Sequence, residues 1–123
     1  MTSLTLALMQ AKAQPRGLSE TVDALSQSMQ HAAQLGADVL ITPELFLSGY
    51  GDPTDTAHYA QRQGAEILQT FAQLAARNRI ALVLGYPERV QCGIFNSVIV
   101  FDKSGQVICV NGGVKPDQRA AQK

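Results

Sequence analysis

The chain has 123 residues, of which 46% are hydrophobic and 16% are charged, and such a composition is typical of one ordinary folded domain. Ten Lys and Arg balance ten Asp and Glu without any basic cluster, so the charge pattern excludes a surface built for the phosphate backbone of nucleic acids. No segment approaches the roughly 20 consecutive apolar residues that cross a bilayer, so no membrane partner is expected.

The N-terminal residues Leu4 to Gln10 are predicted to form the first strand. They imitate the apolar part of a signal peptide, but no Lys or Arg precedes them and Gln10 interrupts the run. Cys92 and Cys109 lack C-x-x-C spacing and allow at most one bridge, which suits a reducing compartment. We therefore expect a cytoplasmic protein.

Apolar periodicity predicts an alternation of strands and helices after this strand. Ser19 is expected to cap a helix whose apolar stripe recurs every three to four residues and which Gly36 ends. The alternation indicates an α/β fold with about five strands and two helices. The other predicted elements are a strand at 38–42, a loop at 45–58, a helix through 67–75, and strands at 80–85, 94–101 and 106–110.

Two features of the C-terminal half bear on assembly. Asp102 to Gly105 is predicted to be a hairpin loop, and the strand before it is apolar on both faces, so both faces need to be covered. Residues 111–123 contain two glycines and a proline without apolar periodicity, which predicts a disordered tail after a domain at 1–110.

Glu44 is the strongest candidate for chemistry. It follows the apolar run Val39 to Ile41, and ligands of open α/β sheets lie at the carboxyl ends of strands. Apolar neighbours could desolvate such a carboxylate and adapt it to general acid or base work. The alternative is a first-turn glutamate favoured by a helix dipole.

The surroundings of Glu44 resemble a known family. The segment from Ala37 to Tyr50, ADVLITPELFLSGY, is similar to the general-base motif of the nitrilase superfamily of carbon-nitrogen hydrolases. Two further segments, IALVLGYPER at 80–89 and IFNSV at 94–98 with DKSG at 102–105, resemble that family's third strand and following hairpin. The resemblance runs from about Leu4 to Val110 and covers less than half of the family's domain.

This resemblance implies the N-terminal part of an α-β-β-α sandwich that cleaves non-peptide amide or nitrile bonds of small molecules. The family needs no cofactor or metal and uses a Glu, a Lys and a Cys: the thiolate attacks, the ammonium stabilises the developing charge and the Glu moves protons. Glu44 matches the general base, and Tyr50 could line the mouth of the substrate site.

The other two catalytic residues do not carry over. The family's lysine lies in a Tyr-Arg-Lys-x-His-Leu strand, whereas Lys115 is two positions away from that place and Pro116 follows it. We therefore interpret Lys115 as a solvated tail residue and keep it only as a secondary candidate. Cys109 is interpreted as a small core residue and Cys92 as a turn residue, so the nucleophile is expected in a later segment and the chain in isolation is expected to be inactive.

Weaker candidates and the alternative function remain open. His31 is interpreted as a surface residue, His58 as a loop or helix-start residue, and Asn96 as a structural hydrogen-bonding residue. Gly112 and Gly113 could form an anion nest but no phosphate-binding motif accompanies them. The alternative to a hydrolase interrupted after Val110 is a non-catalytic α/β interaction module, and in either case we expect a homo-oligomer or association with a missing second half.

Overall fold

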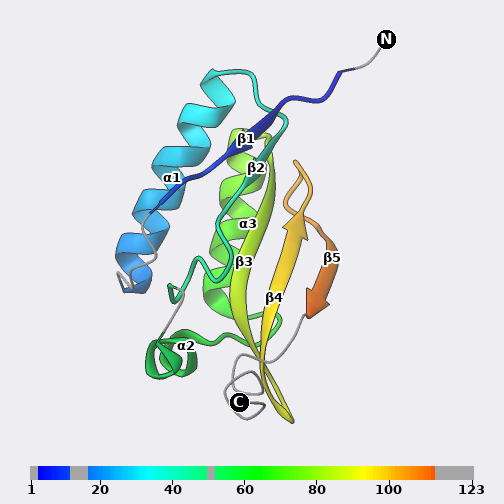
Figure 1. Ribbon diagram of the computed structural model, residues 1–123. Coiled ribbons are helices and arrows are strands. Elements are labelled where there is room, and N and C mark those ends of the chain that lie inside the picture. The colour runs from blue at the N-terminus through cyan, green and yellow to red at the C-terminus, as the bar shows by residue number, and fades with distance from the viewer. Residues whose placement is uncertain (1–2, 12–16, 50–51, 113–123) are drawn as a thin grey trace.

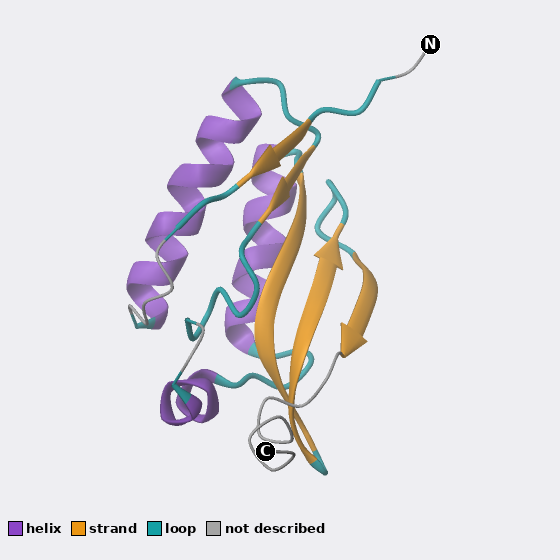
Figure 2. Ribbon diagram, viewed as in Figure 1, coloured by secondary structure: helices purple, strands orange, loops and turns teal. Residues whose placement is uncertain are grey.

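A mixed five-stranded sheet organises the part of the chain that the computed structural model describes, which is residues 3–11, 17–49 and 52–112. Figure 1 labels the elements, and Figure 2 shows the helices and strands as separate layers. In chain order the elements are β1 (Leu6–Leu8), α1 (Leu18–Gln34), β2 (Val39–Ile41), α2 (Pro53–Tyr59), α3 (Glu66–Asn78), β3 (Ala81–Val90), β4 (Gly93–Phe101) and β5 (Val107–Gly112).

The strands lie in the sheet in their order along the chain, β1-β2-β3-β4-β5. β1, β2 and β3 are parallel and are joined by helical crossovers, whereas β4 and β5 are added as antiparallel neighbours. The predicted α/β fold is confirmed, and each predicted strand is present with shifted ends. β1 is shorter than the predicted span, while β3 and β5 extend further.

One face of the sheet forms the core with α1 and α3, which lie side by side behind it in Figure 1. Alternate side chains of β3 and β4 point to these helices, because successive side chains of a strand face opposite ways. The fully buried core side chains from the sheet and helices include Leu25, Met29, Phe71, Leu82, Leu84 and Tyr86.

The other face of the sheet is not covered by any described helix (Figure 2). It carries Leu6 and Leu8 of β1 and Val98 of β4, which are 53%, 70% and 37% exposed. The two apolar faces predicted for 94–101 are therefore both present, and the described helices cover only one of them. We call this second surface the open face.

The start of α1 differs from the prediction that Ser19 caps it. Gly17 is the N-cap and contributes no side chain, while both the backbone N–H and the hydroxyl of Thr21 donate to the Gly17 carbonyl, at 3.1 and 2.8 Å. This places Ser19 inside the first turn. The predicted end is confirmed, because Gly36 follows the C-cap with a φ of 80°, a conformation that glycine adopts without strain.

The predicted loop at 45–58 is wrong in its second half, which contains α2. Asp52 caps this helix by accepting a hydrogen bond from the Thr54 N–H at 2.8 Å, and Pro53 occupies its first turn. His58 lies in the last turn and packs edge-on against Tyr59. An Asp followed by Pro is a helix-start signal that the sequence already contained.

β3 continues through Pro87 to Val90, well past its predicted end at Gly85. The Pro87 carbonyl accepts from the Gln61 N–H at 2.9 Å on the edge away from β4, so the missing proline N–H faces that same edge. β2 has ended by then, since its last pair joins Ile41 to Val83. The ladder between β3 and β4 is therefore unaffected by the proline.

The β4–β5 loop is held by Asp102, as its predicted hairpin requires. The Asp102 carboxylate accepts from the Ser104 hydroxyl, the Ser104 N–H and the Gln106 N–H, and these hydrogen bonds keep its pKa below the usual value. β5 runs to Gly112, two residues beyond the predicted end of the domain, so Asn111 and Gly112 belong to the sheet. The rest of the predicted tail, residues 113–123, lies outside the described residues.

Candidate active site

Glu44 lies in the turn that follows β2, at the carboxyl end of that strand and beside β3. The prediction of its place after the second strand holds, but the desolvation considered for its carboxylate is not found, because the Glu44 side chain is exposed. The apolar neighbours that follow it, Leu45, Phe46 and Leu47, are themselves buried. Exposure leaves Glu44 accessible to a ligand on the open face.

The backbone on both sides of Glu44 is fastened to β3. The Thr42 N–H donates to the Val83 carbonyl at 2.9 Å, and the Thr42 hydroxyl oxygen accepts from the Gly85 N–H at 3.0 Å. On the other side of Glu44, the Phe46 N–H donates to the Gly85 carbonyl at 2.9 Å. The position of Glu44 is therefore set by hydrogen bonds made two residues before it and two residues after it.

Gly85 permits this close approach because it has no side chain. A Cβ added there would lie 2.6 Å from the Pro43 carbonyl oxygen, 2.9 Å from the Leu45 nitrogen and 3.0 Å from the Glu44 Cα. Leu45 has a φ of 51°, a left-handed conformation that costs a non-glycine residue roughly 1–2 kcal/mol, and its buried side chain offsets this strain. The turn bearing Glu44 is thus bent tightly over Gly85.

Asn96 of β4 reaches the carboxylate from the opposite side of β3. Its side-chain amide donates a hydrogen bond to Glu44 Oε1. Asn96 pairs with Pro87, and Gly85 and Pro87 are the β3 residues that face the open side between the two polar groups. Neither Gly85 nor Pro87 has a long side chain, so the side chains of Asn96 and Glu44 can meet above β3.

The sequence interpretation of Asn96 missed this contact, since it assigned the residue a structural role only. The signal that could have revealed the contact is the position of Asn96 in β4 opposite the small residues Gly85 and Pro87 of β3. Reading that signal requires the antiparallel register, in which Gly85 faces Val98 and Pro87 faces Asn96.

A second polar cluster lies on the helix side of the same strands. Glu88 is only 4% exposed and accepts from the Ser97 hydroxyl at 2.8 Å and from the Gln63 side-chain amide at 2.9 Å. Tyr86 is fully buried nearby, and burial, followed by the charge of Glu88, raises the pKa of its phenol well above the usual value. This cluster is separated from Glu44 by the sheet.

Among the described residues, neither cysteine is brought to Glu44. Tyr50 and Lys115 lie outside the described residues. Cys92 lies in the β3–β4 turn and Cys109 is exposed on β5 opposite Val100, rather than in the core as predicted. Each is removed from Asn96 by four strand positions, roughly 13 Å, which is beyond proton-transfer reach of Glu44.

No group of three or more His, Cys, Asp or Glu side chains is arranged to hold a metal ion within the described ranges. His31 is exposed in the last turn of α1, as predicted for a surface residue. No helix in the described part of the chain is both long and apolar enough to cross a membrane.

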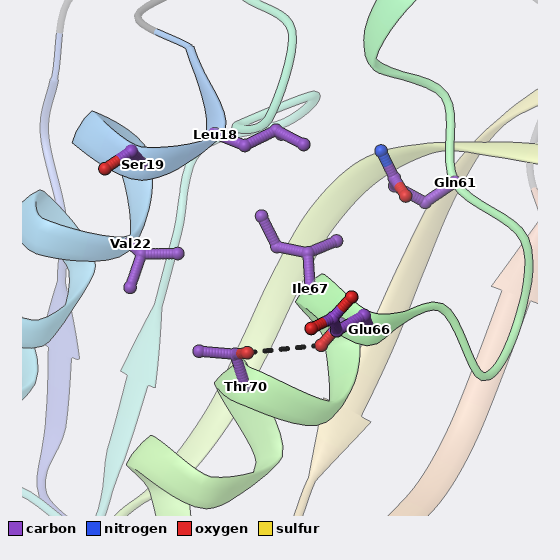
Figure 3. A pocket seen from close by; sticks show the side chains of 7 residues that line it. All are labelled: Leu18, Ser19, Val22, Gln61, Glu66, Ile67 and Thr70. Atoms are coloured by element: carbon purple, nitrogen blue, oxygen red, sulfur yellow. Dashed lines mark hydrogen bonds between the residues drawn. The ribbon is translucent and has the colours of Figure 1, made fainter.

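A cleft of about 390 Å³ opens between the N-terminal ends of α1 and α3 (Figure 3). Leu18 and Val22 of α1 face Ile67 of α3 across it, and Gln61 closes one side. Glu66 and Thr70 belong to the same turn of α3, where the Thr70 hydroxyl donates to the Glu66 carbonyl at 3.2 Å. The cleft shares no lining residue with the Glu44 site.

Comparison with known proteins agrees with the fold. The family model described as carbon-nitrogen hydrolase matches residues 5–116. A hydrolase in the pqqF 5'region of Pseudomonas protegens is 33% identical over 109 residues, which are 87% of this chain and 38% of that protein. The omega-amidase NIT2-A of Xenopus laevis is 29% identical over 109 residues, covering 88% of this chain and 39% of that one.

Solved structures with a similar fold are also amidases. An amidase from Nesterenkonia sp. AN1 superimposes with a TM-score of 0.78 at 26% identity, over 97% of this chain and 48% of that chain. The same amidase, described as a member of the nitrilase superfamily, has been solved with its active-site cysteine modified by acrylamide and, as a cysteine-to-alanine variant, in complex with butyramide.

The mixed sheet with helices on one face is similar to part of the structures of nitrilase-superfamily amidases. This chain belongs to the carbon-nitrogen hydrolase family. It spans less than half of the length of the relatives and solved amidases that it matches.

Proposed function

We propose that this chain supplies Glu44 as the general base of a carbon-nitrogen hydrolase site that cleaves amide or nitrile bonds of small molecules. The observation that supports this role is the exposed Glu44 carboxylate held over Gly85 by Asn96 at the carboxyl end of β2. The amidases and omega-amidase among its relatives make short aliphatic amides the substrate class of choice.

In the proposed reaction Glu44 takes the proton of a cysteine thiol while the sulfur bonds to the amide carbon. The proton then passes from Glu44 to the leaving amine, and water cleaves the thioester by the same proton route. A lysine ammonium near the substrate oxygen stabilises the charge that develops there. The cysteine and the lysine would come from outside the described residues, and Lys115 is retained as the secondary candidate for the cation.

The chain 1–123 by itself is expected to hydrolyse no short aliphatic amide, because neither Cys92 nor Cys109 is within reach of Glu44. Ammonia release from butyramide and propionamide is the measurement. Turnover that disappears in Glu44→Gln would contradict the expectation and would identify one of the two cysteines as the nucleophile.

A hybrid enzyme tests the proposal directly. Residues 1–112 are joined to the part of the Nesterenkonia amidase that follows its matched segment, and near-ultraviolet circular dichroism checks folding. Butyramide hydrolysis is expected in the hybrid, and Glu44→Gln should lower kcat by about 10² to 10⁴, the range for loss of a general acid or base.

Glu66→Gln is the matched control, because Glu66 is an exposed glutamate on α3 away from the site. It should leave kcat unchanged. A folded, active hybrid whose rate is insensitive to Glu44→Gln would remove Glu44 from the mechanism.

A further inference from the structure

We propose that Asn96 is a positioning residue for Glu44, which holds one carboxylate oxygen so that the other is presented to the reacting proton. The inference rests on the proposed function, because Glu44 needs a defined orientation only if it moves protons. It starts from the hydrogen bond between the Asn96 side-chain amide and Glu44 Oε1.

The backbone around Asn96 is fixed from both sides of β4. Asn96 pairs with Pro87 of β3, and the next residue, Ser97, pairs with Tyr86 on one edge and with Gly112 on the other. Ser97 also donates to the buried Glu88 from the helix side of the sheet. Since successive residues of a strand point to opposite faces, the anchoring of Ser97 on one face directs Asn96 to the open face.

The Glu44 carboxylate is otherwise a mobile group, because its side chain is exposed and has several free torsions. The turn beneath it is fixed by Thr42 and Phe46, so the backbone is positioned but the carboxylate is not. Asn96 is the donor to this carboxylate within the described part of the chain, and its hydrogen bond to Oε1 removes the remaining freedom and leaves Oε2 as the basic oxygen. In this arrangement one carboxylate oxygen of Glu44 is held by Asn96 and the other is available for proton transfer.

An amide suits this task better than a charged donor. Asn donates through an N–H that does not titrate, so the contact persists across the pH range in which a carboxylate exchanges its proton. A lysine or arginine in its place would favour the ionised carboxylate more strongly and oppose proton uptake. An aspartate at position 96 would repel the Glu44 carboxylate.

The contact is tested in the full chain by following the Asn96 side-chain amide resonances in ¹⁵N-labelled protein as the solution is acidified. We expect them to shift as the Glu44 carboxylate gains its proton and to remain still in Glu44→Gln. Asn78 is the internal reference, because its side-chain amide donates to the neutral Leu74 carbonyl at 2.9 Å. Asn96 resonances that do not respond, or that respond equally in Glu44→Gln, overturn the proposal.

A double-mutant cycle gives a second measurement that does not need activity. Asn96→Asp keeps the shape of the side chain but sets two carboxylates in contact. Their repulsion grows as both ionise, so raising the pH from 3 to 7 should lower the folding equilibrium constant of this variant about tenfold more than that of the wild type. Combining it with Glu44→Gln should abolish this extra pH dependence. If the extra dependence survives in the double variant, Asn96 does not act on Glu44.

The kinetic consequence is measured in the hybrid hydrolase. Asn96→Ala should lower kcat about ten- to hundredfold with little change in KM, as expected when a hydrogen bond to a charged group is lost from the reacting base. An inactive hybrid would count against the proposed function while the resonance measurement still decides the contact. An active hybrid with unchanged kcat in Asn96→Ala would overturn the positioning role alone.

Discussion

The Tyr86 hydroxyl is a buried polar group with no hydrogen-bond partner within the described ranges. A buried donor without a partner is costly, and the neighbouring Glu88 carboxylate makes ionisation of the phenol costlier still. The folded protein therefore keeps the Tyr86 proton at alkaline pH, whereas the unfolded chain releases it near pH 10.

This difference predicts the alkaline stability of the protein. Above about pH 10 the unfolded state binds fewer protons than the folded state, so the free energy of unfolding falls as pH rises, by up to about 1.4 kcal/mol per pH unit. Tyr86→Phe should remove this part of the fall and, because it also removes the hydroxyl without a partner, should raise the free energy of unfolding at pH 7. Urea unfolding between pH 8 and pH 11 measures it, with Tyr59→Phe on α2 as the control. An equal alkaline fall in wild type and Tyr86→Phe would refute the assignment.

Gly85 is the residue on which the Glu44 turn depends most directly. Gly85→Ala brings a Cβ to within 2.6 Å of the Pro43 carbonyl, so the turn has to move or the strand has to bend. We expect a loss of about 1–3 kcal/mol in the free energy of unfolding, typical of overpacking, measured by urea denaturation. Gly112→Ala, whose nearest contact would be 3.3 Å away on the Ser97 hydroxyl, should cost clearly less. An equal loss of unfolding free energy in Gly85→Ala and Gly112→Ala would show that the Glu44 turn can move away from the added Cβ without strain.

At the scale of elements, α3 ends on a residue that is strained. Arg79 has a φ of 53°, and its N–H donates to the carbonyls of Ala75 and Ala76. Arg79→Gly should relieve the left-handed strain and raise the free energy of unfolding by about 0.5–1 kcal/mol, net of the added flexibility of the unfolded chain. Arg77→Gly, inside the last turn, should instead lower it by about 1 kcal/mol. Thermal melts of both variants give the comparison, and a destabilised Arg79→Gly would contradict it.

Local sequence signals were enough to predict most elements. β2, α3 and β4 follow from short apolar runs and periodicity, and Asp52 with Pro53 would have located α2 if those capping signals had been weighed. The extension of β3 past Pro87 could not be predicted in this way. It depends on pairing with β4 up to Val90 and Gly93, and Gln61 from a distant segment bonds the other edge of β3.

The same distinction applies to the candidate site. The place of Glu44 after β2 is local information, because an apolar run and a proline mark the end of the strand. Its partner could not be inferred from spacing, because Asn96 reaches Glu44 only through the order β2-β3-β4 and the register that sets Asn96 opposite Pro87.

At the scale of the whole molecule, the open face is the feature from which we predict the behaviour of the chain in solution. Leu6, Leu8 and Val98 are exposed on it, and Val83 and Val100 between them are only half-buried. These strand residues are all apolar, and the charged Glu44 carboxylate lies at the border of the band, over Gly85. Exposed apolar surface that is contiguous favours association, because monomers rarely leave large apolar patches in contact with water.

We therefore expect chain 1–123 to self-associate sheet to sheet at micromolar concentration. Val98→Lys sets a charge in the middle of the open face and should raise the dissociation constant about tenfold or more, because burial of one valine contributes about 1.5–3 kcal/mol. Sedimentation velocity measures the association, and an apolar dye reports the exposed surface. Leu35→Lys is the matched control, because Leu35 is 70% exposed at the end of α1 and lies off the sheet. A monodisperse wild-type monomer that binds no dye would show that the open face is covered.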